Sequence, residues 1–472
     1  MAGRRGRWRL PALGLVSLLL YGVLASVRTW SGAEDVGRFL GLMVILFVLY
    51  GAALLVLRTD RWREVRWVLL GAVLFRVAVL PAGVEGGWTG LGAADPGELA
   101  YETYLLYDND VWRYLWDGHV LLSGVDTYRH SPEEIDLRSD EPPFEALLDD
   151  DRWQEVHARV AYAGYRTVYP PLAQLAFVAS AAVAPASAAA WKLLLLAADL
   201  LTCWLLVDLL RRRGHGPGAA AIYAWNPLAI KELVGSGHVD ALLIACLVLA
   251  FWLLDRGRGA LALTALGGAI LVKLTPLLVV PLFLRRVPVR SWWVLPALAA
   301  AAYGPFLGSL PTMVESVGAF ARDWTFNPGL WLLVFEGGRG LGVEGRSLAD
   351  GVGAAAALGL LAFALWRDHR RPEGDLESLA TSCLLVLGGY VLTSPTVMPW
   401  YLLWALPLCA LRPGPAWPAV TFASLASYGI YIDGVERTPW LVVEHGFIVV
   451  VLAIILLRGR RRLLPSGGRE PT

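Results

Sequence analysis

The chain has 472 residues, of which 56% are hydrophobic and only 17% charged, and its formal net charge is +1. A soluble protein ordinarily carries about 25% charged residues, so the composition excludes an ordinary soluble enzyme. The near-zero net charge also removes any electrostatic basis for binding nucleic acid. Because the apolar residues occur in blocks that approach the length needed to cross a bilayer, we expect an all-α polytopic membrane protein.

Apolar segments follow one another along the whole chain, and we expect about 11 to 14 transmembrane helices in a single domain covering residues 1–472. The segments cover residues 10–27, 38–57, 66–81, 170–183, 188–210, 218–233, 239–254, 260–284, 292–307, 351–366, 376–392, 400–411, 416–430 and 441–457. Two of them are ambiguous. Segment 170–183 is either re-entrant or amphipathic, or it crosses against the charge pattern. Segment 260–284 is either one long segment or two short ones broken at Lys273-Leu274-Thr275-Pro276.

Arginine-rich turns predict the orientation, because positively charged short loops face the cytoplasm. These turns lie at the N-terminus and at residues 58–66, 211–213, 285–290, 367–371 and 458–462. We therefore expect a multi-pass plasma membrane protein with both termini in the cytoplasm. Residues 82–169 then form a large, acidic extracytoplasmic loop, and residues 309–350 form a second one.

The cysteines and the lysines lie in apolar surroundings. The four cysteines have neither disulfide nor metal-ligand spacing, so we expect buried, unreactive thiols. The chain has only three lysines, Lys192, Lys231 and Lys273, and each lies within or at the edge of an apolar run. A charge inside the membrane is costly and usually faces a cavity or a partner, so these lysines point either to an anionic ligand or to internal ion pairs.

The first outer loop contains a cluster of carboxylates and aromatic residues that begins at Asp108. In a helix, Asp110, Arg113 and Tyr114 would share one face at positions i, i+3 and i+4. A carboxylate beside a partly dry aromatic surface is suited to accept a proton from a sugar hydroxyl, and a guanidinium can bind a phosphate with two hydrogen bonds. The same spacing is equally compatible with an ordinary surface Asp–Arg pair.

A second polar group interrupts the apolar region after Trp225-Asn226-Pro227. Lys231-Glu232 is followed by Gly235-Ser236-Gly237-His238-Val239-Asp240, which predicts a tight turn on the outer side. Such a turn can hold a phosphate or orient a hydroxyl, or it is only a solvated hairpin tip. Lys231 and Glu232 can also neutralise each other in a structural pair.

Three further motifs complete the polar outer side. Tyr169-Pro170-Pro171 predicts a rigid corner between the loop and the next membrane segment. Lys273 lies deepest in an apolar run. Pro399-Trp400-Tyr401 places two aromatic rings at an outer turn, where an interfacial aromatic belt is an equally good explanation.

Taken in order, these motifs resemble the GT-C superfamily of membrane glycosyltransferases, in particular bacterial polyprenyl-phosphate-mannose-dependent alpha-mannosyltransferases of the DUF2029 kind. The resemblance covers most of the chain from Tyr107 to Tyr401. It is carried by Asp110-Val-Trp-Arg113-Tyr114-Leu-Trp-Asp117-Gly118, Gly124-Val-Asp-Thr-Tyr128, Tyr169-Pro170-Pro171, Asn226-Pro227, Gly235-Ser-Gly-His238-Val-Asp240, Lys273-Leu-Thr-Pro276 and Pro399-Trp400-Tyr401. One departure is Met398, at a position where relatives often have histidine.

The resemblance implies a role for each motif. Asp110, with Asp108 as the neighbouring alternative, matches the acidic residue that serves as the general base. The implied substrate-binding residues are Arg113, Tyr114, Asp117, Tyr169, Lys231, His238, Asp240, Lys273, Trp400 and Tyr401. The Asp108-Asn109-Asp110 triplet is similar to a metal-binding motif, but superfamily members with lipid-phosphate donors often work without metal. We therefore expect neither a metal ion nor another cofactor.

The resemblance implies an inverting glycosyltransferase that moves a sugar, expected to be mannose, from a polyprenyl-phosphate donor to a glycan or glycolipid acceptor at the outer membrane face. A transporter or flippase for a lipid-linked sugar is the alternative, because transporters also bind substrates at broken helices. The hydropathy pattern contains no inverted repeat, and the polar motifs gather on one side, which favours the transferase.

Overall fold

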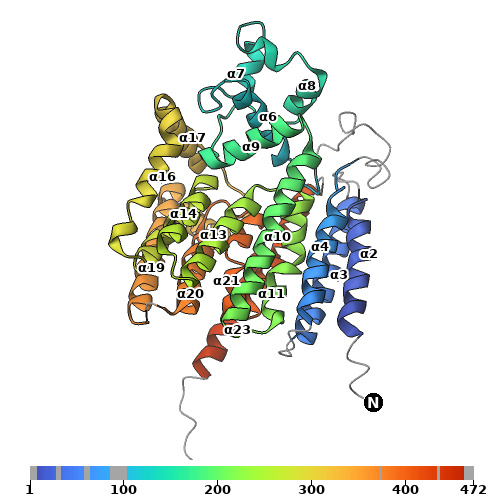
Figure 1. Cartoon of the computed structure of the whole chain (residues 1–472), viewed down its shortest axis with the longest axis vertical. Coiled ribbons are helices and arrows are strands. Elements are labelled where there is room, and N and C mark those ends of the chain that lie inside the picture. Colours follow the sequence, from blue (N-terminus) through green and yellow to red (C-terminus); the bar gives the residue numbers. More distant parts are fainter. Residues whose placement is uncertain are drawn as a thin grey trace, which may run out of the picture.

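The computed structural model describes residues 8–27, 33–57, 64–84, 104–372, 374–432 and 436–461. Within these residues the chain is helical and contains no β-strand, although Phe326 and Thr396 form an isolated bridge. Figure 1 shows long helices side by side, with a smaller group of short helices covering one end of the bundle. The chain is an all-α polytopic membrane protein, as its composition predicts.

Five described helical segments are long and apolar enough to cross a membrane, and a sixth span results if one bent pair is counted as a single crossing. The five are Glu34–Val56, Ala188–Arg212, Val289–Asp323, Gly345–His369 and Leu376–Thr393, and the bent pair is Pro227–Gly235 with Asp240–Asp255. The shorter apolar helices are Arg9–Leu24, Pro171–Val183, Gly259–Val272, Thr275–Leu284, Pro399–Leu411 and Thr438–Val451. The count of 11 to 14 crossings stays a prediction.

The helices of the N-terminal half include the cap, which is the group of short helices from α6 to α8 (residues 110–158) that covers one end of the bundle in Figure 1. They are α2 (Arg9–Leu24), α3 (Ala33–Val56), α4 (Val65–Val79), α6 (Asp110–Leu122), α7 (Pro132–Leu137), η2 (Glu145–Leu147), α8 (Asp151–Ala158), α9 (Pro171–Val183), α10 (Ala188–Arg212), α11 (Pro217–Ala224) and α12 (Pro227–Ile230). The π-helix η3 (Lys231–Gly235) and α13 (Asp240–Asp255) follow. Part of the predicted first loop, residues 85–103, lies outside the described residues, as do the basic residues of the first seven positions.

The C-terminal half completes the bundle. Its elements are α14 (Gly259–Val272), η4 (Thr275–Val279), α15 (Val280–Leu284), η5 (Val289–Ser291), α16 (Val294–Tyr303), η6 (Gly304–Ser309), α17 (Leu310–Asp323), α18 (Leu330–Gly340), α19 (Gly345–His369), α20 (Leu376–Thr393), η7 (Pro399–Trp404), α21 (Leu408–Leu411), α22 (Ala416–Ala423), η8 (Ser424–Tyr431) and α23 (Thr438–Arg461). Residues 309–350, predicted as a second outer loop, thus contain α17, α18 and the start of α19.

Proline and polar residues break several segments that the sequence pattern treated as continuous. Segment 218–233 was predicted as one helix, but α11 ends at Ala224 and a new helix begins at Pro227. Pro227 has no N–H to continue the helical ladder, and the Asn226 side chain accepts hydrogen bonds from the backbone N–H groups of Leu228 and Ala229. Of the two alternatives for segment 260–284, the broken one is present, since α14 ends at Val272.

Helix α9 lies against α6 under the cap, which bears on the ambiguity of residues 170–183. The helix has only 13 residues, too few for a full crossing, and Figure 1 shows it beside α6 at the capped end of the bundle. Contact between the two helices is close: a Cβ atom at Gly118 would lie 2.4 Å from the carbonyl oxygen of Phe177. The geometry therefore supports a short, non-spanning helix.

A buried ion pair joins three helices inside the bundle. Arg76 of α4 donates from Nε to Asp199 Oδ2 of α10 at 2.6 Å, and both side chains are completely buried. The same guanidinium donates to the carbonyl oxygen of Ala224 at the end of α11, and the Tyr223 hydroxyl donates to Asp199. Neither residue lies in a motif that the sequence reading selected.

Candidate active site

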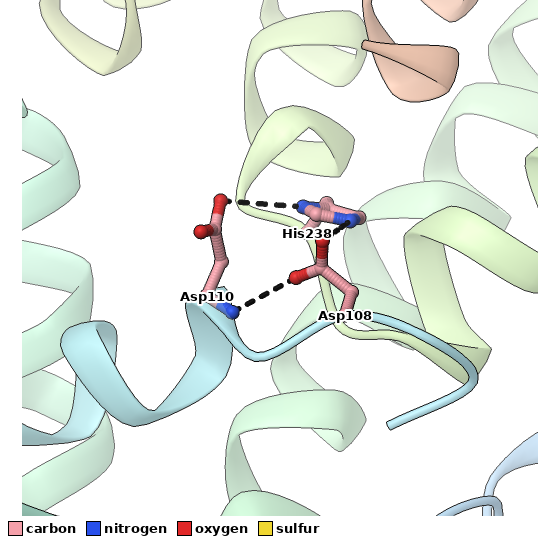
Figure 2. Close-up of side chains that lie close together, drawn as sticks. All are labelled: Asp108, Asp110 and His238. Carbon is pink, nitrogen blue, oxygen red and sulfur yellow. Dashed lines mark hydrogen bonds and ion pairs between the residues drawn. The ribbon is translucent and has the colours of Figure 1, made fainter. Parts of the chain in front are cut away.

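Three side chains from two distant parts of the chain meet at the junction of the cap and the bundle (Figure 2). Asp108 lies in the turn before α6, Asp110 is the first residue of α6, and His238 lies in the bend before α13. Leu106 and Tyr107 have positive φ angles of 50° and 63°. This left-handed turn places Asp108 where its Oδ1 accepts the backbone N–H of Asp110 at 2.8 Å.

His238 lies between the carboxylates. Its Nδ1 is 3.7 Å from Asp110 Oδ2, and its Nε2 is 3.5 Å from Asp108 Oδ2 and 3.2 Å from Glu232 Oε2. The imidazole is completely buried and stacks on the Trp400 indole with 3.7 Å between ring centroids. Because an imidazolium is stabilised by nearby carboxylates, this position favours a protonated His238.

The bend that carries His238 has a local cause. The chain turns by 119° between η3 and α13, and Gly237 has a φ of +82°, a conformation that glycine adopts without steric cost. The Gly237 carbonyl accepts a hydrogen bond from Trp191 Nε1 at 2.8 Å. The turn predicted over residues 235–240 is thus present, but it lies buried against α10 and is not a solvated hairpin tip.

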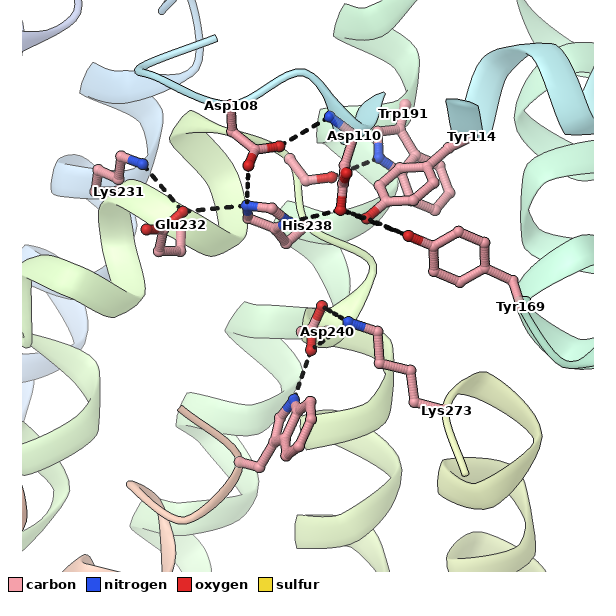
Figure 3. A network of polar contacts seen from close by, with 12 residues as sticks. Asp108, Asp110, Tyr114, Tyr169, Trp191, Lys231, Glu232, His238, Asp240 and Lys273 are labelled. Atoms are coloured by element: carbon pink, nitrogen blue, oxygen red, sulfur yellow. Dashed lines mark hydrogen bonds and ion pairs between the residues drawn. The ribbon is translucent and has the colours of Figure 1, made fainter. Parts of the chain in front are cut away.

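A second ion pair lies beside His238, as Figure 3 shows. Lys231 Nζ donates to Glu232 Oε2 at 3.1 Å and to the Tyr428 hydroxyl at 2.9 Å, and both charged side chains are completely buried. The prediction that Lys231 and Glu232 neutralise each other is confirmed. The Lys231 ammonium is therefore already paired with Glu232 and Tyr428, whereas the Glu232 carboxylate also faces His238.

Lys273 and Asp240 form a separate pair on the bundle side of His238 (Figure 3). Lys273 Nζ donates to both carboxylate oxygens of Asp240 at 2.8 and 3.0 Å, and Trp404 Nε1 donates to the same carboxylate at 2.5 Å. The ammonium also lies 5.0 Å from the centroid of the Tyr401 ring. Unlike Lys231, Lys273 keeps 14% of its side chain exposed.

Two tyrosine hydroxyls face the carboxylate of Asp110. Tyr114 and Tyr169 approach Asp110 Oδ2 at 3.2 and 3.5 Å, and the Tyr114 ring stacks on Phe177 of α9. Burial, followed by the charge of Asp110, raises the pKa of both hydroxyls well above the usual value. They therefore remain protonated donors, while the Asp110 side chain keeps 33% of its surface exposed.

Arg113 does not take the position that the sequence reading expected. It was expected to accompany Asp110, but its Nε donates to Asp117 Oδ1 at 2.8 Å and its Nη1 donates to the Tyr165 carbonyl. Asp117 also accepts from Gln174 of α9. These contacts hold α6 against α9, so they support a structural role for Arg113 and Asp117.

The structure adds residues that the sequence-derived set lacked. Glu232, Trp404 and Tyr428 each contact a charged side chain of the site. Glu232 could be noticed in the sequence because it is an acid in an apolar run. A structural pair with Lys231 was a sufficient explanation for its presence there. Nothing in the sequence marked Trp404 or Tyr428 as site residues, since an aromatic residue in an apolar helix is ordinarily part of the core.

The Asp108, Asp110 and His238 side chains are also close enough to hold a metal ion. Their ligand atoms lie within 4.8 Å of one another, and carboxylate with imidazole is a donor set that suits several divalent metals. The same atoms also make direct contacts among themselves. The geometry is therefore compatible with a metal ion and equally with a metal-free charge network.

The known proteins that this chain resembles in sequence are named as mannosyltransferases. Residues 103–287 match the model of the family described as alpha-(1→6)-mannopyranosyltransferase, N-terminal domain. The chain resembles bacterial alpha-mannosyltransferases of the GT-C type. The matched range contains every sequence-derived site residue except Trp400 and Tyr401.

Individual relatives extend this likeness beyond the matched range. The alpha-(1→6)-mannopyranosyltransferase A of Mycobacterium tuberculosis is 26% identical over 367 aligned positions, and the alignment covers 69% of this chain and 67% of the relative. A probable alpha-(1→6)-mannopyranosyltransferase of Mycolicibacterium smegmatis is 24% identical over 76% of this chain and 72% of its own length. GPI mannosyltransferase 1 of Gibberella zeae is 32% identical over 106 residues, 22% of this chain and 23% of the relative. No solved structure matches the chain significantly.

Proposed function

We propose that this chain is an inverting mannosyltransferase. It transfers mannose from a polyprenyl-phosphate donor to a glycan or glycolipid acceptor at the outer membrane face, and both of its termini are cytoplasmic. The names of the relatives support the mannosyl group. The arginine-rich turns support the orientation. The observation that carries the proposal is Asp110, a partly exposed carboxylate surrounded by an otherwise buried charge network.

Asp110 has the surroundings of a general base. It accepts the proton of the acceptor hydroxyl as that oxygen attacks the anomeric carbon of mannose. The bond between the anomeric carbon and the phosphate oxygen breaks, and polyprenyl phosphate leaves with the electron pair. Attack from the side opposite the leaving group inverts the configuration. Tyr114 and Tyr169 orient the carboxylate, and Asp108 holds the first turn of α6 through the Asp110 N–H.

Lys273 is the cation best placed to meet the departing phosphate. Its ammonium is partly exposed, whereas Lys231 is completely buried against Glu232. Asp240 and Trp404 fix its position. A preorganised cation in a site of low polarity stabilises charge as it develops on a leaving group. His238 adds a second positive group near the reacting atoms. Trp400 lies against His238, and Tyr401 lies against Lys273.

We propose that no metal ion takes part in the reaction, because His238 and Lys273 already supply positive charge. Purified protein should transfer radiolabelled mannose from polyprenyl-phosphate mannose to a pool of membrane glycolipids, with activity in EDTA within about twofold of the untreated rate. Loss of transfer in EDTA and its recovery with a divalent ion would assign Asp108, Asp110 and His238 as metal ligands instead. Passage of labelled donor across a vesicle membrane without transfer would favour a flippase.

The pH dependence of transfer should report on Asp108. Burial raises the pKa of this carboxyl to about 7, against the opposing effect of His238. Below that pH the carboxyl is neutral and no longer attracts His238, so kcat/KM should fall as the pH drops through about 7. In Asp108→Asn, which keeps the acceptor for the Asp110 N–H, this inflection should disappear. A profile that is identical in wild type and variant would contradict the assignment.

A further inference from the structure

A cavity lined by arginines lies at the end of the bundle remote from Asp110. The cavity has a volume of about 240 Å³, and its lining residues are Arg367, Arg371, Asp375, Glu377, Ser378 and Arg412. We call it the arginine cavity. It lies where α19 ends and α20 begins, and both helices are candidate membrane spans.

Helix α10 shows how far this cavity lies from the candidate active site. Trp191, near its start, contacts the Gly237 carbonyl beside His238, whereas Arg213, just after its end, contacts the Gly374 carbonyl in the loop between α19 and α20. A helix rises about 1.5 Å per residue, so the two contacts are separated by roughly 30 Å. That distance matches the hydrocarbon thickness of a bilayer. The arginine cavity therefore belongs to the opposite membrane face.

Arg367 and Arg412 of this cavity donate hydrogen bonds to neutral groups. Among the described residues, no carboxylate lies within salt-bridge distance of Arg367, Arg371 or Arg412. Arg367 donates to the Ser378 carbonyl and to the hydroxyls of Ser378 and Ser382. Arg412 donates to the Thr381 hydroxyl at 3.4 Å.

The two acids in the lining, Asp375 and Glu377, contact groups other than the three arginines. The Asp375 side chain accepts the backbone N–H of Ser378 at 2.8 Å and thereby caps the N-terminus of α20. Glu377 lies 3.0 Å from the imidazole of His215. Within the part of the chain that the structure describes, three guanidinium groups thus converge on one small space without a bonded carboxylate. The peptide dipoles of α20 add to the positive potential there.

We propose that the arginine cavity binds the phosphate group of an anionic phospholipid. Guanidinium groups match the planar pairs of oxygens on a phosphate, and basic pockets between transmembrane helices bind the head groups of anionic lipids. The location at the ends of two spans places the cavity at the depth of the head groups. This inference does not depend on the proposed function. Inorganic phosphate presents the same chemistry from a different source.

The test measures thermal unfolding of the full chain in detergent with added lipid, together with native mass spectrometry of bound lipid. Phosphatidylglycerol should raise Tm in a saturable manner, as a ligand of the native state does, and phosphatidylcholine should not. In Arg371→Gln/Arg412→Gln the affinity for phosphatidylglycerol should fall about tenfold, because two charge-assisted hydrogen bonds are lost. Both arginines are exposed, so their replacement should leave the fold intact.

Arg370→Gln is the matched control. Arg370 is the chain neighbour of Arg371, but it stacks on Trp366 and does not line the cavity. This variant should bind phosphatidylglycerol as the wild type does. The proposal is overturned if the double variant and the wild type bind equally, or if phosphatidylcholine binds as well as phosphatidylglycerol. Displacement of the lipid by millimolar inorganic phosphate would overturn the lipid as the source and assign free phosphate.

Discussion

Asp110→Asn is expected to lower kcat for mannose transfer by about 10²- to 10⁴-fold, the range that a general base contributes. The amide is nearly isosteric with the carboxylate and keeps an oxygen that the hydroxyls of Tyr114 and Tyr169 can approach, so the cap should remain folded. It cannot take the acceptor proton. The measurement is transfer of radiolabelled mannose at saturating donor and acceptor, normalised to the amount of folded protein.

Asp136→Asn is the control for this variant. Asp136 is an exposed acid of α7 in the same cap, and it contacts none of the site residues described above. Its replacement should leave kcat within about twofold of wild type, as expected for a surface substitution. Full activity in both Asp110→Asn and Asp108→Asn/Asp110→Asn would show that neither carboxylate is the base.

Arg76→Leu is expected to lower the free energy of unfolding by about 3–5 kcal/mol, because it leaves Asp199 as an unpaired buried carboxylate. Arg76→Leu/Asp199→Leu should recover most of this loss, since replacing both members of a buried pair by apolar residues is often close to neutral. Thermal unfolding in detergent of the two variants and the wild type measures the difference.

Arg38→Leu provides the comparison at an exposed pair. Arg38 and Glu34 form an ion pair at the start of α3, but their side chains are 63% and 78% exposed. Such a pair contributes about 0–1 kcal/mol, so this variant should unfold close to the wild-type temperature. Equal losses in Arg76→Leu and in the double variant would show that packing, and not the unpaired charge, explains the effect.

The local breaks of the helices were largely predictable from the sequence. Pro276 after Lys273 and Pro170-Pro171 before α9 act through the missing N–H and the fixed φ angle of proline, and these act on the residues next to them in the chain. The break at Asn226-Pro227 was missed although the same signal was present, because the apolar run continued on both sides. For such short-range effects the sequence pattern is informative.

The pairing of charges was less predictable. Lys231 and Glu232 are adjacent in the chain, and their ion pair, one of the alternatives that the sequence left open, is present. Arg113 had two acids within helical reach, Asp110 and Asp117, and spacing alone does not decide between them. The packing of α6 on α9 selects Asp117 as the partner of Arg113, because Gln174 and the Tyr165 carbonyl lie on the side of Asp117.

The sequence by itself determined the class of the protein and the residues where chemistry is possible. Long continuous apolar runs that cross lipid must satisfy their own backbone hydrogen bonds, and runs of this length do so as helices. Charges and tight turns inside apolar runs are costly, so His238 and Lys273 could be selected without any coordinates. Asp110 was selected in the outer loop by its aromatic neighbours.

Only the tertiary structure decided which of these residues act together. The meeting of Asp108 with His238, the stacking of His238 on Trp400 and the pairing of Arg76 with Asp199 each join helices far apart in the chain. Such contacts depend on how whole helices pack, which is set by the summed fit of many side chains. The pattern of apolar residues within a single segment does not contain the information about how whole helices pack.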